Sequence, residues 1–228
     1  MTAAFVTATG TDVGKTFVTA GLIRHFRTAG RAVEAFKPVV SGFDPATPAL
    51  SDPGMLLAAL GHKVTPEDLD RIAPFRFAAP LSPDMAARRE GRILEFDSVV
   101  EFSRRAIDGP SGMRLIEGVG GIMVPLDDRH TVLDWMAALR IPVVVVAGSY
   151  LGSISHTLTC LDVLQRRELR VPVVVVSETS GSAVPLDETV ASVSRFAAPV
   201  PVIGLPRLTS RVLHPAFGEI AKLLTVTP

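Results

Sequence analysis

Three short stretches place cations, a hydroxyl and a carboxylate where they could handle phosphate groups. Lys15 and Thr16 follow the glycine-containing turn in "ATGTDVGKT", Lys37 follows an apolar run, and Glu117 closes another apolar run before "GVGG". A lysine neutralises phosphoryl oxygens, whereas a threonine hydroxyl and a carboxylate are oxygen ligands suited to Mg²⁺. These residue types predict a site that binds the phosphates of a nucleotide and Mg²⁺ and that can stabilise a transferring phosphoryl group.

The turn before Lys15 has the context of a phosphate-binding loop, although it departs from the common pattern. The apolar run Ala3–Thr7 leads into the turn, and a helix-like segment follows it. Gly10 and Gly14 would let successive backbone N–H groups face one anion, and the helix N-terminus adds its dipole. In G-x-x-x-x-G-K-[ST] the first glycine would fall at Thr9, so this loop must be of another type.

Alternation of apolar and helix-like segments predicts the fold. The runs "IPVVVVAG" and "VPVVVVSE" are continuous and β-branched, as in parallel strands that are covered on both faces. The predicted strands are these two runs, "PVPVIGLP", Ala3–Thr7, Val33–Val39 and Arg114–Ile116. The predicted helices are Gly14–Ala29, Pro53–Leu60, Ser98–Ile107, Thr131–Leu139, Ser153–Leu169 and Asp187–Phe196. This order predicts an α/β protein with a doubly wound, mostly parallel sheet flanked by helices, similar to P-loop NTPases.

The length and the proline distribution predict the domain organisation. The 228 residues suit a single domain of ordinary size. Residues 43–112 carry the proline-rich stretches "FDPATPALSDP" and "PFRFAAPLSPD", which are typical of loops. We therefore expect a loop-rich insertion over the carboxyl ends of the strands, where such sheets bind ligands.

Composition argues against several classes of protein. Apolar residues make up 47% of the chain, and 23 basic residues balance 23 acidic ones. This balance gives no support for binding to nucleic acid or to a membrane surface, and no run reaches the roughly 18 apolar residues of a membrane span. The single Cys160 cannot form an internal disulfide, and the first segment lacks the basic region of a signal peptide. A cytoplasmic location is expected.

The loop resembles the T-G-T-x-T-x-V-G-K-T loop of the dethiobiotin synthetases, which is one residue longer than the common type. The first glycine of that loop falls at residue 8, where this chain has alanine. Because alanine tolerates a positive φ poorly, we expect strand-like dihedral angles at Ala8 and conformational freedom at Gly10. The resemblance covers most of the chain, and it implies that the nucleotide is bound by Asp12, Val13, Gly14, Lys15, Thr16 and Phe17.

The stretch "FKPVVSG" resembles the family's K-P-x-x-S-G segment, which carries the catalytic lysine and a substrate-binding serine. The resemblance implies that Lys37 and Lys15 neutralise carbamate and phosphoryl oxygens. It also implies that Thr11 and Ser41 hydrogen-bond the carbamate or the amine of the substrate. Lys37, Lys15 and Thr11 are therefore the candidate catalytic residues.

Two further stretches bear on the metal. "IEGVGGIMVPL" resembles the family's V-E-G-A-G-G segment, and "LSDP" has aspartate where the family has a metal ligand. An isolated aspartate before a helix is more often an N-cap, but the resemblance implies a Mg²⁺ set of Thr16, Asp52 and Glu117. The glycine-rich turn after Glu117 would bring backbone close to the nucleotide or the substrate, through Gly118, Val119 and Gly120.

The stretch "GSYLGSISHTLTCL" resembles the family's L-G-x-x-N-H segment, in which a helix N-terminus receives the substrate carboxylate, often across a subunit interface. The implied substrate contacts are Gly152, Ser153, Ile154 and Ser155, the last of which replaces the family's asparagine. We expect His156 to be packed or at a dimer interface rather than to act as a base. Asp84 likewise replaces a histidine of the family in "APLSPD".

The predicted adenine end departs from the family in a similar way. After the second valine run the family has asparagine and an acidic residue, and this chain has Ser177 and Glu178. An asparagine side chain matches the amino group and ring nitrogen of adenine. Serine is shorter, so either backbone groups take over or base selectivity is weaker. The chain contains no asparagine, which also excludes the guanine-reading N-K-x-D motif. "GLPRL" resembles the loop that packs on the base, with contacts implied for Pro206, Arg207 and Leu208.

Taken together, the resemblance implies a homodimeric, ATP- and Mg²⁺-dependent ligase of biotin biosynthesis that acts on 7,8-diaminopelargonic acid and CO₂. Three alternatives stand beside it. A glutamine-dependent amidoligase would need a further domain. A partitioning or septum-positioning switch would have lysine in place of Gly10 and often an amphipathic tail, unlike "FGEIAKLLTVTP". A family member that binds nucleotide without turnover remains open because of Ser155 and Ser177.

Overall fold

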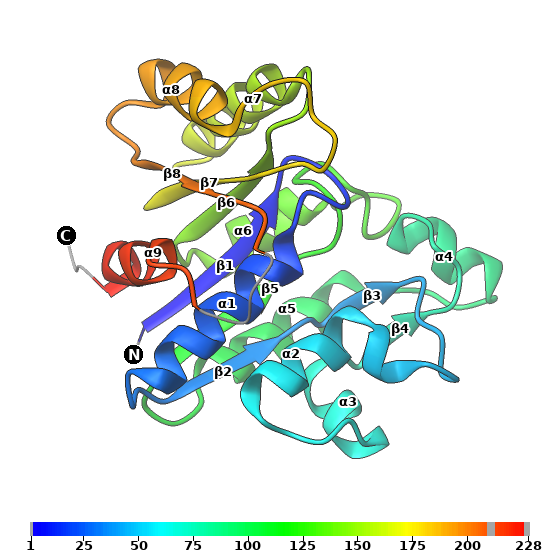
Figure 1. Cartoon of the computed structure of the whole chain (residues 1–228). Coiled ribbons are helices and arrows are strands. Elements are labelled where there is room, and N and C mark those ends of the chain that lie inside the picture. Colours follow the sequence, from blue (N-terminus) through cyan, green and yellow to red (C-terminus); the bar gives the residue numbers. More distant parts are fainter. Residues whose placement is uncertain (1, 209–212, 226–228) are drawn as a thin grey trace.

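The computed structural model describes residues 2–208 and 213–225, so the last three residues of "FGEIAKLLTVTP" lie outside the described part. Within these residues the main sheet has six strands in the order β2-β5-β1-β6-β7-β8, all parallel (Figure 1). The strands are β1 Thr2–Ala8, β2 Val33–Phe36, β5 Met113–Glu117, β6 Val143–Gly148, β7 Val173–Ser177 and β8 Val202–Leu205. The predicted parallel α/β architecture is confirmed.

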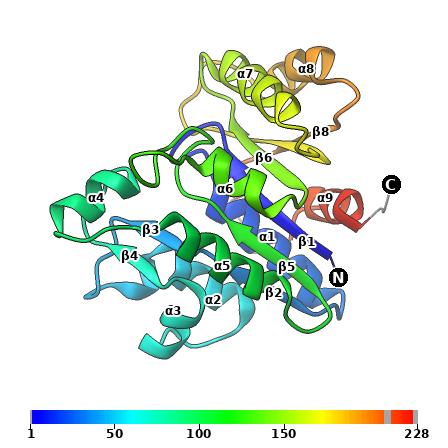
Figure 2. The same ribbon diagram turned by 180° about the vertical axis from the view of Figure 1, so that it is seen from behind.

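Helices cover both faces of this sheet. Figure 1 shows α1, α2 and α9 in front of the strands, and Figure 2 shows α5 and α6 in front when the molecule is seen from behind. Helices α7 and α8 pack on each other beside β6, β7 and β8. The helices are α1 Lys15–Thr28, α2 Asp52–Leu60, α3 Pro66–Ile72, α4 Pro83–Arg89, α5 Phe96–Ile107, α6 Val132–Leu139, α7 Ser153–Arg166, α8 Leu186–Ala197 and α9 Ala216–Thr225, with a 3-10 turn at Pro48–Leu50. None of these described helices has the length and apolar character needed to cross a membrane.

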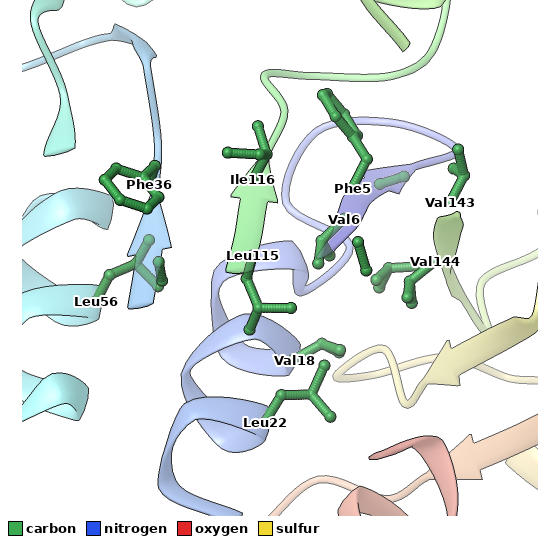
Figure 3. Close-up of a cluster of buried hydrophobic side chains, with 14 of the residues drawn as sticks. Phe5, Val6, Val18, Leu22, Phe36, Leu56, Leu115, Ile116, Val143 and Val144 are labelled. Atoms are coloured by element: carbon green, nitrogen blue, oxygen red, sulfur yellow. The ribbon is translucent and has the colours of Figure 1, made fainter. Parts of the chain in front are cut away.

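The central strands bury both of their faces. Val6 of β1 points toward Val18 and Leu22 of α1, whereas Phe5 points to the opposite side of the sheet (Figure 3). There the Phe5 ring meets the edge of Trp135 from α6, with ring centroids 4.8 Å apart. Such two-sided burial explains why the parallel strands read as continuous apolar runs rather than as alternating ones.

The parallel arrangement brings the ends of three strands to one edge of the sheet. Val6 pairs with Glu117 across β1 and β5, and Phe36 pairs with Ile116 across β2 and β5. The loop that follows β1, Lys37 after β2, and Glu117 at the end of β5 are therefore neighbours. This carboxyl edge is where doubly wound sheets bind their ligands.

The predicted single strand Val33–Val39 is wrong. The chain leaves the main sheet after Phe36, and β3 (Val39–Ser41) pairs instead with β4 (Phe75–Phe77) in a separate two-stranded sheet. Pro38 has no N–H to continue a ladder, and its carbonyl accepts from Phe75 N at 3.0 Å. Lys37 thus lies in the short link between two sheets.

Residues 43–112 are more regular than the expected loop-rich insertion. Helix α2 packs against α1 and β2, and α5 packs against β5 and α6, so both helices belong to the layers that cover the main sheet. The parts of this segment that reach the carboxyl edge are the start of α2 with the residues just before it, and the residues from Pro80 to the start of α4. The proline-rich stretches themselves contain the 3-10 turn, β4 and the first residues of α2 and α4.

Candidate active site

The phosphate-binding loop connects β1 to α1, and its positive φ angles lie late in the loop. Ala8 is the last residue of β1, as expected for a strand-like conformation. Asp12 and Gly14 have φ of 58° and 98°, whereas Gly10 is not among the residues with positive φ. The expectation that Gly10 supplies the conformational freedom is therefore wrong, because the backbone turns at residues 12–14. A Cβ at Gly14 would also lie 2.9 Å from Ser177 Oγ.

Lys15 is buried at the start of α1, and its side chain reaches back across the phosphate-binding loop. Its Nζ donates to the Gly10 carbonyl at 3.2 Å. Burial, reinforced by repulsion from Lys37, lowers the pKa of the Lys15 ammonium to about 8. Phosphate groups placed against this cation would compensate the loss of solvation, so the lysine is suited to bind an anion that the protein itself does not supply.

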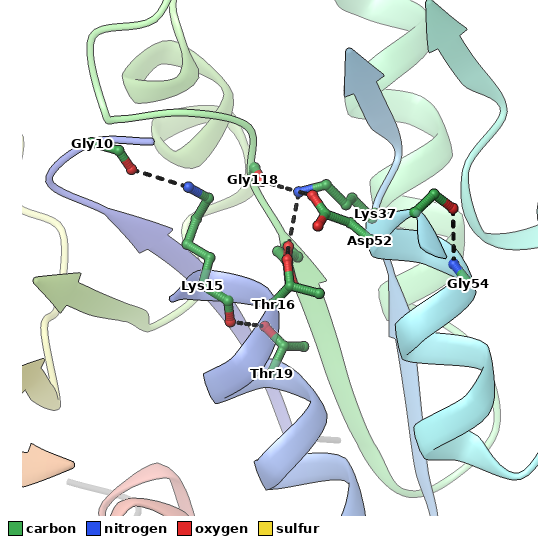
Figure 4. Close-up of polar contacts among 10 residues, drawn as sticks. Gly10, Lys15, Thr16, Thr19, Lys37, Asp52, Gly54 and Gly118 are labelled. Atoms are coloured by element: carbon green, nitrogen blue, oxygen red, sulfur yellow. Dashed lines mark hydrogen bonds and ion pairs between the residues drawn. The ribbon is translucent and has the colours of Figure 1, made fainter. Parts of the chain in front are cut away.

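Lys37 lies at the centre of a buried cluster of charges (Figure 4). Its Nζ donates to Glu117 Oε1 at 2.8 Å and to the Gly118 carbonyl at 3.0 Å, and it lies 3.0 Å from Asp52 Oδ2. Thr16 Oγ1 donates to the same Glu117 Oε1 at 2.6 Å. The predicted metal and catalytic residues from four separate segments are thus brought together.

The carboxylates determine the charge state of this cluster. Burial alone would lower the pKa of Lys37, but the combined attraction and hydrogen bonds of Glu117 and Asp52 outweigh it and raise the pKa. For Asp52, burial acts to raise the pKa, yet the charge and hydrogen bond of Lys37, together with the charge of Lys15, lower it. Lys37 is therefore a permanent cation at neutral pH, which suits electrostatic stabilisation rather than proton transfer.

Asp52 is not the N-cap of its helix. Ser51 occupies the cap position, where its Oγ accepts from Gly54 N at 3.2 Å, and Asp52 is the first helical residue. The capping interpretation of Asp52 is thereby excluded. Its carboxylate instead faces Lys37 and remains half-exposed toward the cavity.

The donor set fits Mg²⁺. Glu117 is fully buried, and its Oε2 has no hydrogen-bond partner among the described residues. Together with the Thr16 hydroxyl and Asp52 it offers hard oxygen ligands at the phosphate-binding loop. No cluster of three or more His, Cys, Asp or Glu side chains suited to a metal occurs in the described residues. This sparse set is typical of Mg²⁺, which completes its coordination with water and substrate phosphates.

A cavity of about 830 Å³ opens beside this cluster. Thr11, Lys15, Lys37 and Asp52 line it, and so does Ser41, whose buried Oγ has no hydrogen-bond partner. Val119 and Gly120 also face it, as predicted. The sequence assigned no contact to several other wall residues, although Pro80 to Pro83 lie in the stretch "APLSPD" that resembles the family: Val40, Leu50, Met55, Pro80, Leu81, Ser82, Pro83 and Val124.

A second cavity of about 450 Å³ adjoins the first, since both are lined by Asp12, Gly14 and Phe17. Its walls include the predicted base-side residues Ser177, Glu178, Arg207 and Leu208, together with Val13 and the unpredicted Thr179 and Ser180. Glu178 Oε2 accepts from Arg207 N at 2.7 Å, which joins the two segments. The geometry suits a base and sugar whose phosphates extend toward Lys15.

Several predicted contacts lie outside these two cavities. Gly118 and Pro206 line neither cavity. A Cβ at Gly118 would come within 2.8 Å of the Phe5 ring, so packing alone explains that glycine.

Two other residues singled out in the sequence have no contact with ligand assigned to them. Asp84 lies in the first turn of α4, and Cys160 is buried with its pKa raised to about 12 by desolvation.

The N-terminus of α7 forms a separate surface. Gly152 is its N-cap with φ of 99°, and the Gly152–Ser155 segment lines neither of the two cavities. His156 Nδ1 lies 2.9 Å from the exposed Tyr150 hydroxyl. The predicted role of Gly152, Ser153, Ile154 and Ser155 in binding the substrate carboxylate stays a prediction.

A strand, a glycine-containing loop and a helix that begins Lys-Thr, with an acidic residue closing the neighbouring strand, define a P-loop nucleotide-binding protein. The sequence profile of a family described as an AAA domain matches residues 2–210. The chain is 50% identical over 201 residues to the ATP-dependent dethiobiotin synthetase of Acidiphilium cryptum, covering 87% of this chain and 90% of that protein. It is 49% identical to the ATP-dependent dethiobiotin synthetase of Phenylobacterium zucineum, with 89% and 88% covered. The chain belongs to the family of ATP-dependent dethiobiotin synthetases.

Solved structures share the fold at low sequence identity. A MinC:MinD cell division protein complex from Aquifex aeolicus is 12% identical, with a TM-score of 0.54, over 98% of this chain and 85% of that chain. This likeness concerns the arrangement of strands and helices alone.

Proposed function

We propose that this protein catalyses the ATP-dependent conversion of 7,8-diaminopelargonic acid and CO₂ to dethiobiotin, a step of biotin biosynthesis. The observation that carries the proposal is Lys37. This permanently charged side chain, bonded to Glu117 and paired with Asp52, lies on the wall of a cavity that continues into the phosphate-binding loop. A cation there can hold a carbamate in line with the γ-phosphate of ATP.

The reaction proceeds in three steps: carbamate formation, phosphoryl transfer and ring closure. One amine of the diamine adds to CO₂ and loses a proton, which gives a carbamate. A carbamate oxygen then takes the γ-phosphoryl group, and ADP leaves. The second amine attacks the carbonyl carbon of the mixed anhydride, a proton is lost and phosphate departs as the ring closes. Both lysines neutralise oxygens that gain charge, while Thr11 and Ser41 orient the carbamate or the amine.

We assign the Mg²⁺ ligands to Thr16, Asp52 and Glu117. When bound, the ion neutralises charge on the β- and γ-phosphate oxygens. The protein contributes the placement of these three oxygens and of Lys15 beside them.

The walls of the larger cavity suit the rest of the substrate. Val40, Leu50, Met55 and Leu81 provide an apolar surface for an alkyl chain. We assign its terminal carboxylate to backbone N–H groups at the start of α7, in a homodimer whose partner brings this helix to the cavity. We place the enzyme in the cytoplasm, since its one cysteine is unpaired and buried.

The test is a coupled measurement on the purified protein. Incubation with diaminopelargonic acid, bicarbonate and MgATP should release phosphate and form the ureido product in equal amounts. Omission of the diamine should abolish phosphate release. Diamine-independent hydrolysis would instead indicate a nucleotide switch, and binding of ATP without turnover would indicate a non-catalytic member of the family.

A further inference from the structure

A third cavity, of about 650 Å³, lies at the opposite end of the sheet from the active site. Val33 and Met113, the first residues of β2 and β5, line it, whereas Lys37 beyond the end of β2 and Glu117 at the end of β5 belong to the active site. The end of α1, helix α5, residues 109–112 and the residues Leu60, His62 and Arg71 form further walls. None of the residues assigned to nucleotide or substrate lines this cavity.

Arginines dominate the charge of this cavity. Five of them line it against a single acidic residue, Glu34. Arg71 bonds to Glu34 at 3.0 Å, and Arg105 bonds to Glu101 on its own helix. Within residues 2–208 and 213–225, the other three have no carboxylate within ion-pair distance: Arg27, Arg31 and Arg114.

Arg114 is the most unusual of the three because it is buried within β5, at 6% exposure. Its Nη2 donates to the Pro110 carbonyl at 2.6 Å, and its buried Nε has no hydrogen-bond partner. Glu34 stands opposite Arg114 in the strand register, but its carboxylate bonds to Arg71. A desolvated guanidinium without a counter-ion is costly, and an anion in the cavity would offset that cost.

Arg27 and Arg31 stand at the end of α1 and keep donors available. Arg27 uses Nη1 to donate to the Ala59 carbonyl at 2.7 Å, and the Arg31 guanidinium lies 4.8 Å from the centre of the Phe26 ring. Each guanidinium has five N–H donors in a planar fork, so these contacts leave groups free to bind oxygens. Phe36, Leu60 and Phe102 add apolar surface to the same cavity.

We propose that this cavity binds a small multivalent oxyanion, a phosphate ester or a dicarboxylate, through Arg27, Arg31 and Arg114. Planar guanidinium forks recognise both anions bidentately, and the apolar walls accept a short carbon body. The site is separate from the phosphate-binding loop, so a protein that failed to make dethiobiotin would still bind the anion here.

Isothermal titration calorimetry tests the proposal on the full chain. The phosphate-binding loop is first filled with Mg²⁺ and a non-hydrolysable ATP analogue, so that added phosphate cannot bind there. Inorganic phosphate, glycerol 3-phosphate and succinate are then titrated separately. We expect saturable binding of at least one of them with one site per chain. Glycerol 3-phosphate without succinate would identify the phosphate-ester class, and the converse the dicarboxylate class.

Variants locate the bound anion. Arg31→Gln and Arg27→Gln each remove an exposed cation and should weaken binding by about tenfold or more. Arg114→Gln should do the same, and where it fails to fold the two exposed variants suffice. Arg24→Gln, an exposed arginine of α1 outside the cavity, is the matched control and should change affinity less than about twofold. The proposal is overturned if no probe binds, or if the control loses as much affinity as the cavity variants.

Discussion

At the phosphate end of the active site, the charged side chains are buried and joined to one another, whereas the base end is more exposed. Lys37 and Glu117 share a 2.8 Å hydrogen bond and are almost inaccessible to solvent. At the base cavity Glu178 and Arg207 are exposed, and a backbone N–H makes the bond between them. The fold thus fixes the positions of the charges at the phosphate end, whereas short side chains and backbone groups line the base end.

Removal of the buried cation Lys37 should have the largest effect on activity. Lys37→Ala should lower kcat by about 10³-fold or more, because it deletes the charge that faces the transferring phosphoryl group. ATP affinity should stay within a few-fold, since Lys15 and the loop are intact. Single-turnover product formation and equilibrium ATP titration measure the two effects. Lys63→Ala, at an exposed lysine, is the control. Loss of ATP binding in Lys37→Ala would contradict the assigned role.

A change of pH probes the same end through Lys15. Because burial lowers the pKa of this ammonium to about 8, the cation is present below pH 7 and mostly lost by pH 9. Phosphates bind the charged form, so ATP affinity should fall about tenfold between pH 7 and pH 9. Calorimetric titration across this range measures the slope. Lys15→Gln should bind ATP more weakly with little dependence on pH in this window, and an unchanged slope in that variant would refute the assignment.

A substitution at the base end should change the nucleotide preference only modestly. Wild-type kcat/KM values for ATP, CTP and GTP should lie within about tenfold of one another, since Ser177 provides one short hydroxyl. Ser177→Asn should raise the preference for ATP over CTP by about two- to tenfold, the effect of one neutral hydrogen bond. Steady-state kinetics with the three nucleotides measure this preference as the ratio of the kcat/KM values. Strong ATP selectivity in the wild type would show that backbone groups already read the base.

The smallest effect is expected at residue 8, where the loop departs from the family. Ala8→Gly should leave ATP affinity within about twofold and lower the free energy of unfolding by about 0.5–1 kcal/mol, because Ala8 is already in a strand. Gly14→Ala is the contrasting variant and should weaken ATP binding by at least about tenfold, given its φ of 98°. ATP titration and chemical denaturation report both. A gain in affinity from Ala8→Gly would show that residue 8 limits the loop.

The sequence predicted the elements whose signals are local. β6 and β7 are continuous valine runs, and α1 follows a recognisable loop, so both were found. Lys15 and Thr16 begin α1, and Lys37 and Glu117 mark the ends of the apolar runs of β2 and β5, so these residues were found in the same way. β3 and β4 were missed because each has three residues and exists through the pairing of Val39 with Phe75, far apart in the chain. The cavity walls contributed by Pro80 and Leu81 depend on the same packing.

Two other predictions concern single residues, and their outcomes have different physical causes. Asp52 was read from the resemblance as a ligand rather than as an N-cap. Ser51 takes the cap position, which excludes the capping role, and the ligand role stays a prediction. Gly10 was expected to turn the loop because glycine is the residue most free to do so. The turn is made instead at Asp12 and Gly14. The contacts predicted for Ser153 and its neighbours lie outside both cavities, so they stay a prediction.

One oxygen atom, Glu117 Oε1, accepts hydrogen bonds from both Thr16 and Lys37. It joins the helix that grips the nucleotide and the link that presents the lysine to the same strand of the central sheet. The spacing between Thr16 and Lys37 is therefore set by a single atom of the central sheet before any ligand binds. The residues around Pro80 line the active-site cavity from outside the main sheet, so their movement over a ligand need not displace Glu117.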